Sequence, residues 1–208
     1  MLAPLRYCEE RNETDGAIIR PEVTMLMTPP ERFFVLTGGP GSGKTALVEA
    51  LRERGYACSV EAGRGVIQHH VAIQGPALPW LDPLLFAEMM LSWEMRSYDL
   101  AQHTPGPVFF DRGVPDVQGY LRLLNFPVAS HIRKASQIFR YNPTVFIAPP
   151  WKEIFRQDGE RKQDFEEAVR TYETMRETYT ELNYGLIEIP RASVEERLSF
   201  LLNHVPTG

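Results

Sequence analysis

The chain has 208 residues, of which 43% are hydrophobic and 24% charged, as in an ordinary globular protein. This length fits one α/β domain with a substantial core. The net charge of −5 argues against sequence-independent nucleic-acid binding, which needs a basic surface, so we expect no nucleic-acid partner.

Cysteines and apolar runs bear on the cell compartment. Cys8 and Cys58 form neither a disulfide framework nor a metal-ligand spacing, and we expect two free thiols in a reducing compartment. No apolar run approaches the ~20 residues that span a bilayer. We also expect no signal peptide, because acidic and polar residues soon follow the first six. The default prediction is a cytoplasmic protein.

The N-terminal residues 1–31 show no periodicity and end in a Pro-Pro pair at 29–30. We expect a loosely attached tail, or residues upstream of the true start; the alternative is a functional arm. Residues 32–208 are predicted to form a single domain.

From Arg32 onward, strand-like and helix-like segments alternate. The predicted strands are 33–37, 56–60, 108–110, 144–148 and 186–189. The predicted helices are 44–54, one starting near 63, 83–103, 115–124, 129–138, 164–183 and one starting at 193. This alternation predicts an α/β fold with a mostly parallel sheet covered by helices on both faces.

The helix predicted over 164–183 carries an apolar stripe at i, i+3, i+4 spacing. Its members are Phe165, Ala168, Val169, Tyr172, Met175, Tyr179 and Leu182. We interpret the stripe as core packing and not as a stacking platform.

Residues 38–45 read Gly-Gly-Pro-Gly-Ser-Gly-Lys-Thr, a complete G-x-x-x-x-G-K-[ST] P-loop. A predicted strand precedes the motif and a predicted helix follows it, which is the context that the motif requires. Glycines let backbone N–H groups converge on phosphate oxygens, and the helix start adds further donors. The alternative is a glycine-rich turn that caps an ordinary helix.

The predicted nucleotide-binding residues are Gly38, Gly39, Pro40, Gly41, Ser42, Gly43, Lys44, Thr45 and Ala46. Lys44 is expected to reach the β- and γ-phosphates and to act in catalysis. The Thr45 hydroxyl is expected to ligate Mg²⁺. The predicted cofactors are therefore ATP, or GTP, and Mg²⁺.

A P-loop enzyme needs a second acidic group, usually at the end of a neighbouring strand. Asp111 follows the apolar run 108–110 and should emerge at the carboxyl edge of the sheet, where ligands bind in such folds. We expect Asp111 to ligate Mg²⁺ and to activate an acceptor hydroxyl. The alternative is a turn or cap aspartate.

Two further segments supply candidate residues. Arg156 and Arg161 flank an Asp-Gly turn within 152–163 and are expected to form a catalytic lid, or else a solvated charged turn. Glu61 and Arg64 follow the second predicted strand and are candidates for binding the acceptor's hydroxyls or phosphate; a helix-start Glu with a surface Arg is the alternative.

Other residues carry weaker signals. Arg191 follows the last predicted strand and is a candidate contact of the nucleotide base. Adjacent His69 and His70 point about 100° apart on a helix and are not expected to share a metal. Trp80 and Trp93 are expected in the core or in the wall of an acceptor pocket.

Asp111 followed directly by Arg112 resembles the acid-Arg motif of nucleoside and nucleotide kinases, in which the acid is base or metal partner and the Arg contacts substrate or phosphate. ATPases of the motor and AAA+ type more often carry Asp-Glu there. Phosphoryl transfer to a bound acceptor is therefore favoured over simple hydrolysis.

The chain as a whole resembles the bacterial AAA-type predicted ATPase family of P-loop NTPases. That family is similar to the ribosylnicotinamide kinase domain of NadR and to the nucleoside and nucleotide kinase fold. The resemblance covers about 32–204 and rests on residues 36–45, 61–64, 110–113, 142–143, 148–151 and 157–161.

This resemblance implies a three-layer sandwich with a parallel five-stranded sheet in the order 2-3-1-4-5, and ATP or GTP with Mg²⁺. By position, Lys44, Thr45, Asp111, Arg112, Arg156 and Arg161 match the family's P-loop, acid-Arg and lid residues. A specific nicotinamide-riboside pocket is not recognisable in the sequence, so that activity is not carried over.

Two functions are expected from these residues. The first is a small-molecule kinase that acts on a nucleoside-like or nucleotide-like acceptor, with Arg112, Arg156 and Arg161 stabilising the transferred phosphoryl group. The second is an ATPase or GTPase switch that acts through a protein partner. The acid-Arg pair and the lid-like segment favour the kinase, whereas the lack of an obvious acceptor motif favours the switch.

Overall fold

Five parallel strands form the central sheet of the computed structural model, which describes residues 30–156 and 164–206. The strands are β1 (Phe33–Gly38), β2 (Ala57–Cys58), β3 (Val108–Asp111), β4 (Thr144–Ala148) and β5 (Gly185–Glu188). Their spatial order is β2-β3-β1-β4-β5, and each neighbouring pair is parallel. The predicted order 2-3-1-4-5 is confirmed.

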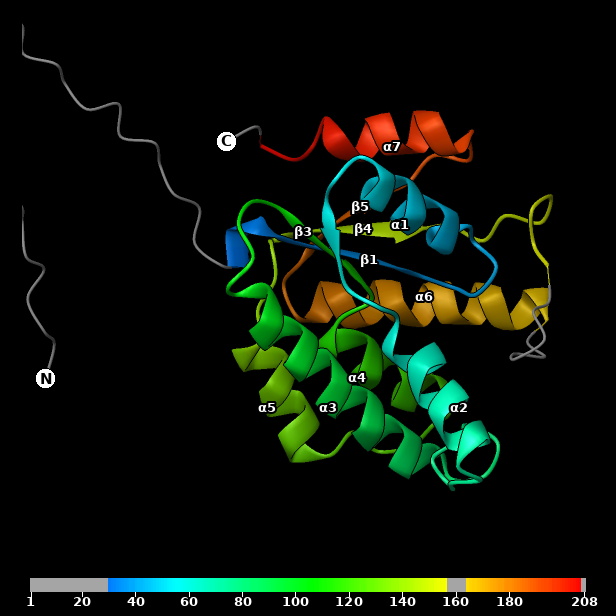
Figure 1. Cartoon of the computed structure of the whole chain (residues 1–208). Coiled ribbons are helices and arrows are strands. Elements are labelled where there is room, and N and C mark those ends of the chain that lie inside the picture. Colours follow the sequence, from blue (N-terminus) through cyan, green and yellow to red (C-terminus); the bar gives the residue numbers. More distant parts are fainter. Residues whose placement is uncertain (1–29, 157–163, 207–208) are drawn as a thin grey trace, which may run out of the picture.

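Helices cover both faces of this sheet, which gives the predicted three layers (Figure 1). A short 3-10 turn, η1 (Pro30–Arg32), leads into β1. The α-helices are α1 (Lys44–Glu53), α2 (Ala62–Ala72), α3 (Pro83–Ala101), α4 (Val114–Leu123), α5 (Ser130–Ile138), α6 (Phe165–Glu181) and α7 (Val194–Leu202). α1 and α7 lie on one face, and α2 to α6 lie on the other (Figure 1).

Alternation along the strands divides the core into two clusters. In β1, Phe33 and Val35 belong to the cluster beneath α2 to α6, whereas Phe34 and Leu36 belong to the cluster beneath α1 and α7. This division follows from the period of two, which sends successive side chains to opposite faces. Since both faces are covered, the strands are apolar throughout, as is typical of buried parallel sheets.

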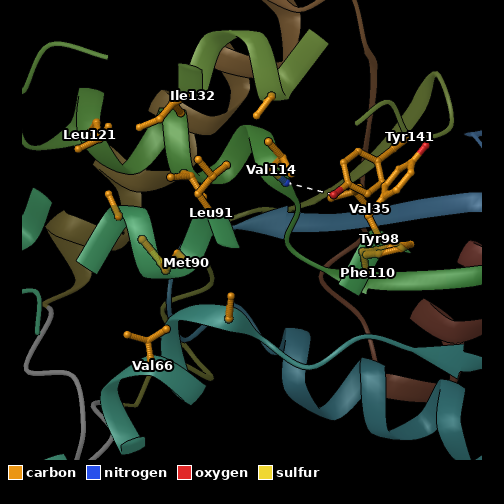
Figure 2. Close-up of a cluster of buried hydrophobic side chains, with 14 of the residues drawn as sticks. Val35, Val66, Met90, Leu91, Tyr98, Phe110, Val114, Leu121, Ile132 and Tyr141 are labelled. Atoms are coloured by element: carbon orange, nitrogen blue, oxygen red, sulfur yellow. Dashed lines mark hydrogen bonds between the residues drawn. The ribbon is translucent and has the colours of Figure 1, made fainter. Parts of the chain in front are cut away.

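The cluster on the α2–α6 side is built around aromatic rings from the sheet and from α3. Figure 2 shows Val35 and Phe110 from the strands beside Tyr98 and Tyr141. The Tyr141 hydroxyl accepts a hydrogen bond of 3.2 Å from the backbone N–H of Val114, the first residue of α4. This contact ties the start of α4 to the core, and the start of α4 carries part of the site described below.

Two predictions of local structure need correction. Strand β2 has two residues instead of the five expected, because it pairs only with β3 at the edge of the sheet. On α6, Val169 is exposed, whereas Thr171 and Thr178 are buried. Burial of Thr171 is possible because its hydroxyl donates to the Glu167 carbonyl at 2.8 Å, so no polar group is left without a partner.

Some predictions concern the cysteines and the membrane. Cys58 is a free thiol, and burial raises its pKa to about 11, so the thiol stays protonated near neutral pH. Cys8 and residues 1–29 of the predicted tail fall outside the described residues, whereas its last two residues belong to η1. Within the described residues, no helix combines the length and apolar character needed to cross a bilayer.

Two glycines with positive φ allow a test of the close packing of β1 against β4. A Cβ atom at Gly38 (φ +125°) would lie 2.4 Å from the Ala148 carbonyl oxygen, whereas one at Gly55 (φ +84°) would meet nothing within 4 Å. Each alanine variant is also strained by its backbone conformation, at a cost of roughly 1–3 kcal/mol. We predict that Gly38→Ala costs about 1–3 kcal/mol more than Gly55→Ala in denaturant unfolding, because β4 must move. Equal losses would contradict this close packing of β1 and β4.

Candidate active site

The P-loop connects β1 to α1 and is packed against neighbouring backbone on several sides. Gly41 and Gly43 have φ angles of +66° and +77°, which L side chains rarely adopt. A Cβ atom at Gly39 would lie 2.3 Å from the Ala168 carbonyl oxygen of α6. The glycines therefore serve both the shape of the loop and its close approach to the rest of the fold.

Lys44 is held against the P-loop itself. Its ammonium group donates to the carbonyl oxygens of Gly38 at 3.1 Å and Gly39 at 2.7 Å and to the Ser42 hydroxyl at 3.2 Å. Only 7% of Lys44 is exposed. Thr45 and Ala46, by contrast, are exposed in the first turn of α1. A positive charge and the N-terminal end of a helix thus meet at one place, as anion binding requires.

Asp111 ends β3 beside the P-loop, as the sequence predicted. In the sheet register it lies opposite Leu36, two residues before the first loop glycine. Asp111 is 5% exposed, and its Oδ1 atom has no hydrogen-bond partner among the described residues. Burial, and then the negative charge of Glu61, raise the pKa of Asp111, while Lys44 and Arg112 act in the opposite direction. A raised pKa and an oxygen without a partner are typical of functional carboxylates.

Arg112 is placed between two carboxylates. Its Nε donates to Glu61 at 3.2 Å, and its Nη1 donates to Asp116 at 3.1 Å. Burial opposes the charge of this guanidinium, but Glu61 and Asp116 outweigh burial and raise the pKa of Arg112, so it stays charged. The backbone of Arg112 has φ +75°, a conformation that costs roughly 1–3 kcal/mol in a non-glycine residue. Such strain is common at functional sites.

Asp116 connects this turn to the sheet and to α6. Its Oδ1 accepts from the Thr37 hydroxyl at 2.6 Å as well as from Arg112, and its Oδ2 accepts from the Gly113 N–H at 3.0 Å and the Tyr179 hydroxyl at 2.6 Å. The sequence analysis did not select Asp116. Its position five residues after Asp111, in the first turn of a helix, was the available signal.

Two side chains from distant parts of the chain brace the P-loop and were also missed. Arg197 of α7 donates to the carbonyl oxygens of Ser42 at 3.1 Å and Gly43 at 3.4 Å. The Phe155 ring lies over Gly41, where an added Cβ would come within 2.5 Å of it. The loop is thereby held from the α7 side and from the segment after β4.

A cavity of about 680 Å³ opens beside the P-loop. Its polar lining comes from Glu61, Glu94, Arg112, Asp116, Glu167 and Thr171, and Pro40 of the P-loop is also part of its wall. Most of the remaining wall is apolar and comes from Ile67, Pro79, Trp80, Phe86, Met90, Val117, Tyr120, Leu123, Leu124 and Met175. A cavity of this size, apolar with a few convergent polar groups, is the usual form of a small-molecule site.

Glu94 is an acidic residue on the otherwise apolar face of α3 that lines the cavity. It follows Phe86 and Met90 at four-residue intervals, so all three share one side of the helix and line the cavity. Glu94 is 2% exposed, and its Oε2 has no hydrogen-bond partner among the described residues. Burial, and then Asp116 and Asp111, raise the pKa of Glu94 well above its usual value. Burial in this position therefore favours the neutral form of the carboxyl group.

The other predicted site residues have different surroundings. Glu61 lines the cavity, and Arg64 lies 3.7 Å from Glu61 with its side chain 37% exposed. Arg156 is exposed and donates to the Phe155 carbonyl of its own segment at 2.9 Å. Arg191 is exposed after β5. Arg161 and the predicted Asp-Gly turn fall outside the described residues, so the expected lid has no structural description.

The two tryptophans named in the sequence analysis differ. Trp80 lines the cavity but is 57% exposed, at the mouth and not in the core. Trp93 is partly buried and packs over Gly65 and against His69. Among the described residues, no group of three or more His, Cys, Asp or Glu side chains could hold a metal ion.

With the geometry established, comparison with known proteins identifies the family. A family model described as an AAA domain matches residues 33–197. The chain belongs to this AAA domain family. No curated protein sequence matches the chain.

NadR and two kinases are among the solved structures with a similar fold. NadR in complex with NR has a TM-score of 0.66 at 16% identity, over 86% of this chain and 52% of NadR, so the chain spans about half the length of NadR. Deoxyadenosine kinase from M. mycoides has a TM-score of 0.57 at 14% identity, over 82% of this chain and 97% of the kinase.

Thymidylate kinase from Ehrlichia chaffeensis has a TM-score of 0.54 at 17% identity, over 84% of this chain and 98% of the kinase. At these identities the likeness establishes a kinase-like P-loop fold. A shared fold does not establish a shared substrate.

The neutral state of Glu94 predicts a pH dependence of stability. Between its ordinary pKa and the raised pKa of the folded state, the folded protein holds a proton that the unfolded chain has lost. The contribution of Glu94 to stability is therefore full at low pH and falls as pH rises through this window. We predict that the free energy of unfolding of Glu94→Gln falls less between pH 5 and pH 8 than that of the wild type.

Glu177→Gln is the control, because Glu177 is exposed on α6. Urea unfolding from pH 5 to pH 8 measures the three proteins. If Glu94→Gln keeps the same pH slope as the wild type, Glu94 is ionised in the folded protein.

Proposed function

We propose that the protein is a kinase that transfers the γ-phosphoryl group of ATP or GTP to a hydroxyl of a small, nucleoside-like acceptor. One observation carries this proposal: a mostly apolar cavity lies beside the P-loop, and Pro40 of that loop forms part of its wall. Glu61, which also lines the cavity, is close enough to Asp111 for its charge to raise the pKa of Asp111. A switch or simple ATPase has no need of a second small-molecule cavity at this position.

The nucleotide side of the site is formed by the P-loop. In the proposal, its backbone N–H groups and the Lys44 ammonium bind the phosphates, and Thr45 and Asp111 hold Mg²⁺. The metal supplies neutralisation of charge on the transferred group. Asp111 fits this role because its Oδ1 is buried without a hydrogen-bond partner among the described residues.

On the acceptor side, Glu61 is the better placed carboxylate. It lines the cavity, whereas Asp111 does not, although the two are close enough for their charges to interact. We therefore assign the general-base role to Glu61 and the metal-side role to Asp111, which differs from the expectation that Asp111 alone does both. Arg112, bound to Glu61 at 3.2 Å, fixes the orientation of that carboxylate.

A transfer screen tests the proposal directly. ATP and GTP labelled at the γ-phosphate are incubated with the protein, Mg²⁺ and a panel of nucleosides, other ribosides and nucleotides, and phosphorylated products are measured. The proposal predicts label in at least one acceptor. Label that appears only as inorganic phosphate, at a rate that no small molecule changes, would favour the switch.

The nucleotide assignment predicts that Lys44→Ala abolishes tight binding of Mg·ATP or Mg·GTP, or the chemistry, while the protein stays folded. The reason is that Lys44 supplies the cationic side chain within the P-loop. Lys134 lies at an exposed position of α5, and the Lys134→Ala variant, which loses the same charge, should bind nucleotide normally. Calorimetry gives the affinities; if the wild type binds neither nucleotide at millimolar concentration, the P-loop assignment is wrong.

The two carboxylates are separated by their response to Mg²⁺. We predict that Asp111→Asn and Glu61→Gln each lower turnover by roughly 10²–10⁴-fold, the usual worth of acid–base or comparable electrostatic help. Only Asp111→Asn should also raise the Mg²⁺ concentration needed for half-maximal rate. An unchanged Mg²⁺ dependence in Asp111→Asn, or near-normal turnover in Glu61→Gln, would reverse the assignment.

A further inference from the structure

Carboxyl groups outnumber basic groups among the described residues of the cavity wall. The described lining residues include the carboxyl groups of Glu61, Glu94, Asp116 and Glu167 but only one basic group, Arg112. A site that binds a phosphate monoester, which carries close to two negative charges at neutral pH, normally presents arginine or lysine donors to it. This cavity presents mainly acidic side chains.

Arg112 is already engaged by protein carboxylates. Its guanidinium contacts Glu61 and Asp116 at 3.2 and 3.1 Å, and its side chain is 14% exposed. To bind a phosphate with both edges, Arg112 would have to leave these partners, and a buried carboxylate that loses its partner is costly. Asp116 is also fixed by Thr37 and Tyr179, so it cannot follow the guanidinium.

Glu94 adds an independent sign of the ligand's chemistry. Its Oε2 is buried at the cavity and has no hydrogen-bond partner in the described part of the chain. A buried, protonated carboxyl group of this kind is stabilised by a group that both donates and accepts hydrogen bonds, such as a hydroxyl. A phosphate dianion bound beside Glu94 would lie near three further carboxyl groups, those of Asp116, Asp111 and Glu61.

We infer that the cavity takes an unphosphorylated acceptor of the nucleoside class and rejects the corresponding nucleoside monophosphates. This inference rests on the proposed kinase function and names its substrate class. Hydroxyl groups of the acceptor donate to the carboxyl oxygens at the inner end of the cavity, including Glu94. The planar ring lies among apolar and aromatic side chains such as Phe86, Trp80 and Tyr120. The volume of about 680 Å³ suits a ligand of this size.

The selectivity arises from repulsion as well as from fit. Like charges a few ångströms apart in a partly buried site repel far more strongly than in water. Rejection of the wrong ligand by unpaired or like charges is a common route to specificity. The same acidic wall that accepts hydroxyl donors therefore excludes an acceptor that already carries a phosphate.

Matched pairs of acceptors test this selectivity. Adenosine, guanosine, cytidine, uridine and thymidine are compared with their 5′-monophosphates, each with ATP and with GTP as donor. We expect at least one nucleoside to be phosphorylated with kcat/KM at least about tenfold above that of its monophosphate, the size of a discrimination of 1.4 kcal/mol. A monophosphate that is the better acceptor overturns the inference and leaves the kinase in place.

The remaining outcomes separate the inference from the proposed function. If the protein binds ATP or GTP but phosphorylates neither class, the nucleoside assignment is wrong. If it transfers phosphate only to non-nucleoside ribosides or other alcohols, the kinase stands and this inference fails. If it binds neither ATP nor GTP, the proposed function itself fails.

A charge variant tests the cause of the selectivity by binding alone. Glu61→Gln removes one acidic group and releases Arg112 from one of its partners, whereas Glu177→Gln removes the same charge from an exposed position on α6. Calorimetry with the nucleoside and its monophosphate gives the ratio of their dissociation constants. We expect the preference for the nucleoside to fall severalfold in Glu61→Gln and to stay unchanged in Glu177→Gln. An unchanged ratio in both variants would show that the acidic wall does not discriminate.

Discussion

The carboxylate of Asp116 is the contact on which the arrangement of the site depends. It accepts hydrogen bonds from Thr37 in β1, from Arg112 and Gly113 in the turn after β3, and from Tyr179 in α6. Four parts of the chain are thereby fixed at one point of the sheet edge. Because Arg112 is held in this way, it in turn holds Glu61, which lines the cavity beside the P-loop. The strained backbone of Arg112 is stabilised by the same contacts.

The site combines two parts with different physical character. The P-loop is a polar, close-packed turn that connects β1 to the start of α1. Arg197 and Phe155 contact it from outside. The cavity is mostly apolar and is formed by side chains from α2, α3, α4 and α6 on one face of that sheet. Exclusion of water by an apolar wall beside a phosphate-binding loop favours transfer to a bound hydroxyl over hydrolysis.

The sequence predicted the features that are encoded locally. The P-loop, the parallel sheet and the position of Asp111 each follow from neighbouring residues, and the structure places them as expected. The cavity could not be predicted, because its lining comes from helices far apart in the chain. Glu94 is an example: a single Glu in a helix usually faces solvent, and only the packing of α3 against α4 shows that it is buried. The prediction that Val169 packs in the core was wrong, because an apolar residue can also lie at the surface.

The central claim is that the cavity beside the P-loop holds the acceptor of a phosphoryl transfer. The most direct measurement is the ratio of phosphorylated acceptor to nucleoside diphosphate formed during steady turnover with ATP or GTP. The account predicts slow turnover without an acceptor, a strong rise with the correct acceptor, and a ratio close to one. If the diphosphate instead forms with an equal amount of inorganic phosphate, whatever small molecule is added, the cavity is not an acceptor site and the protein hydrolyses its nucleotide.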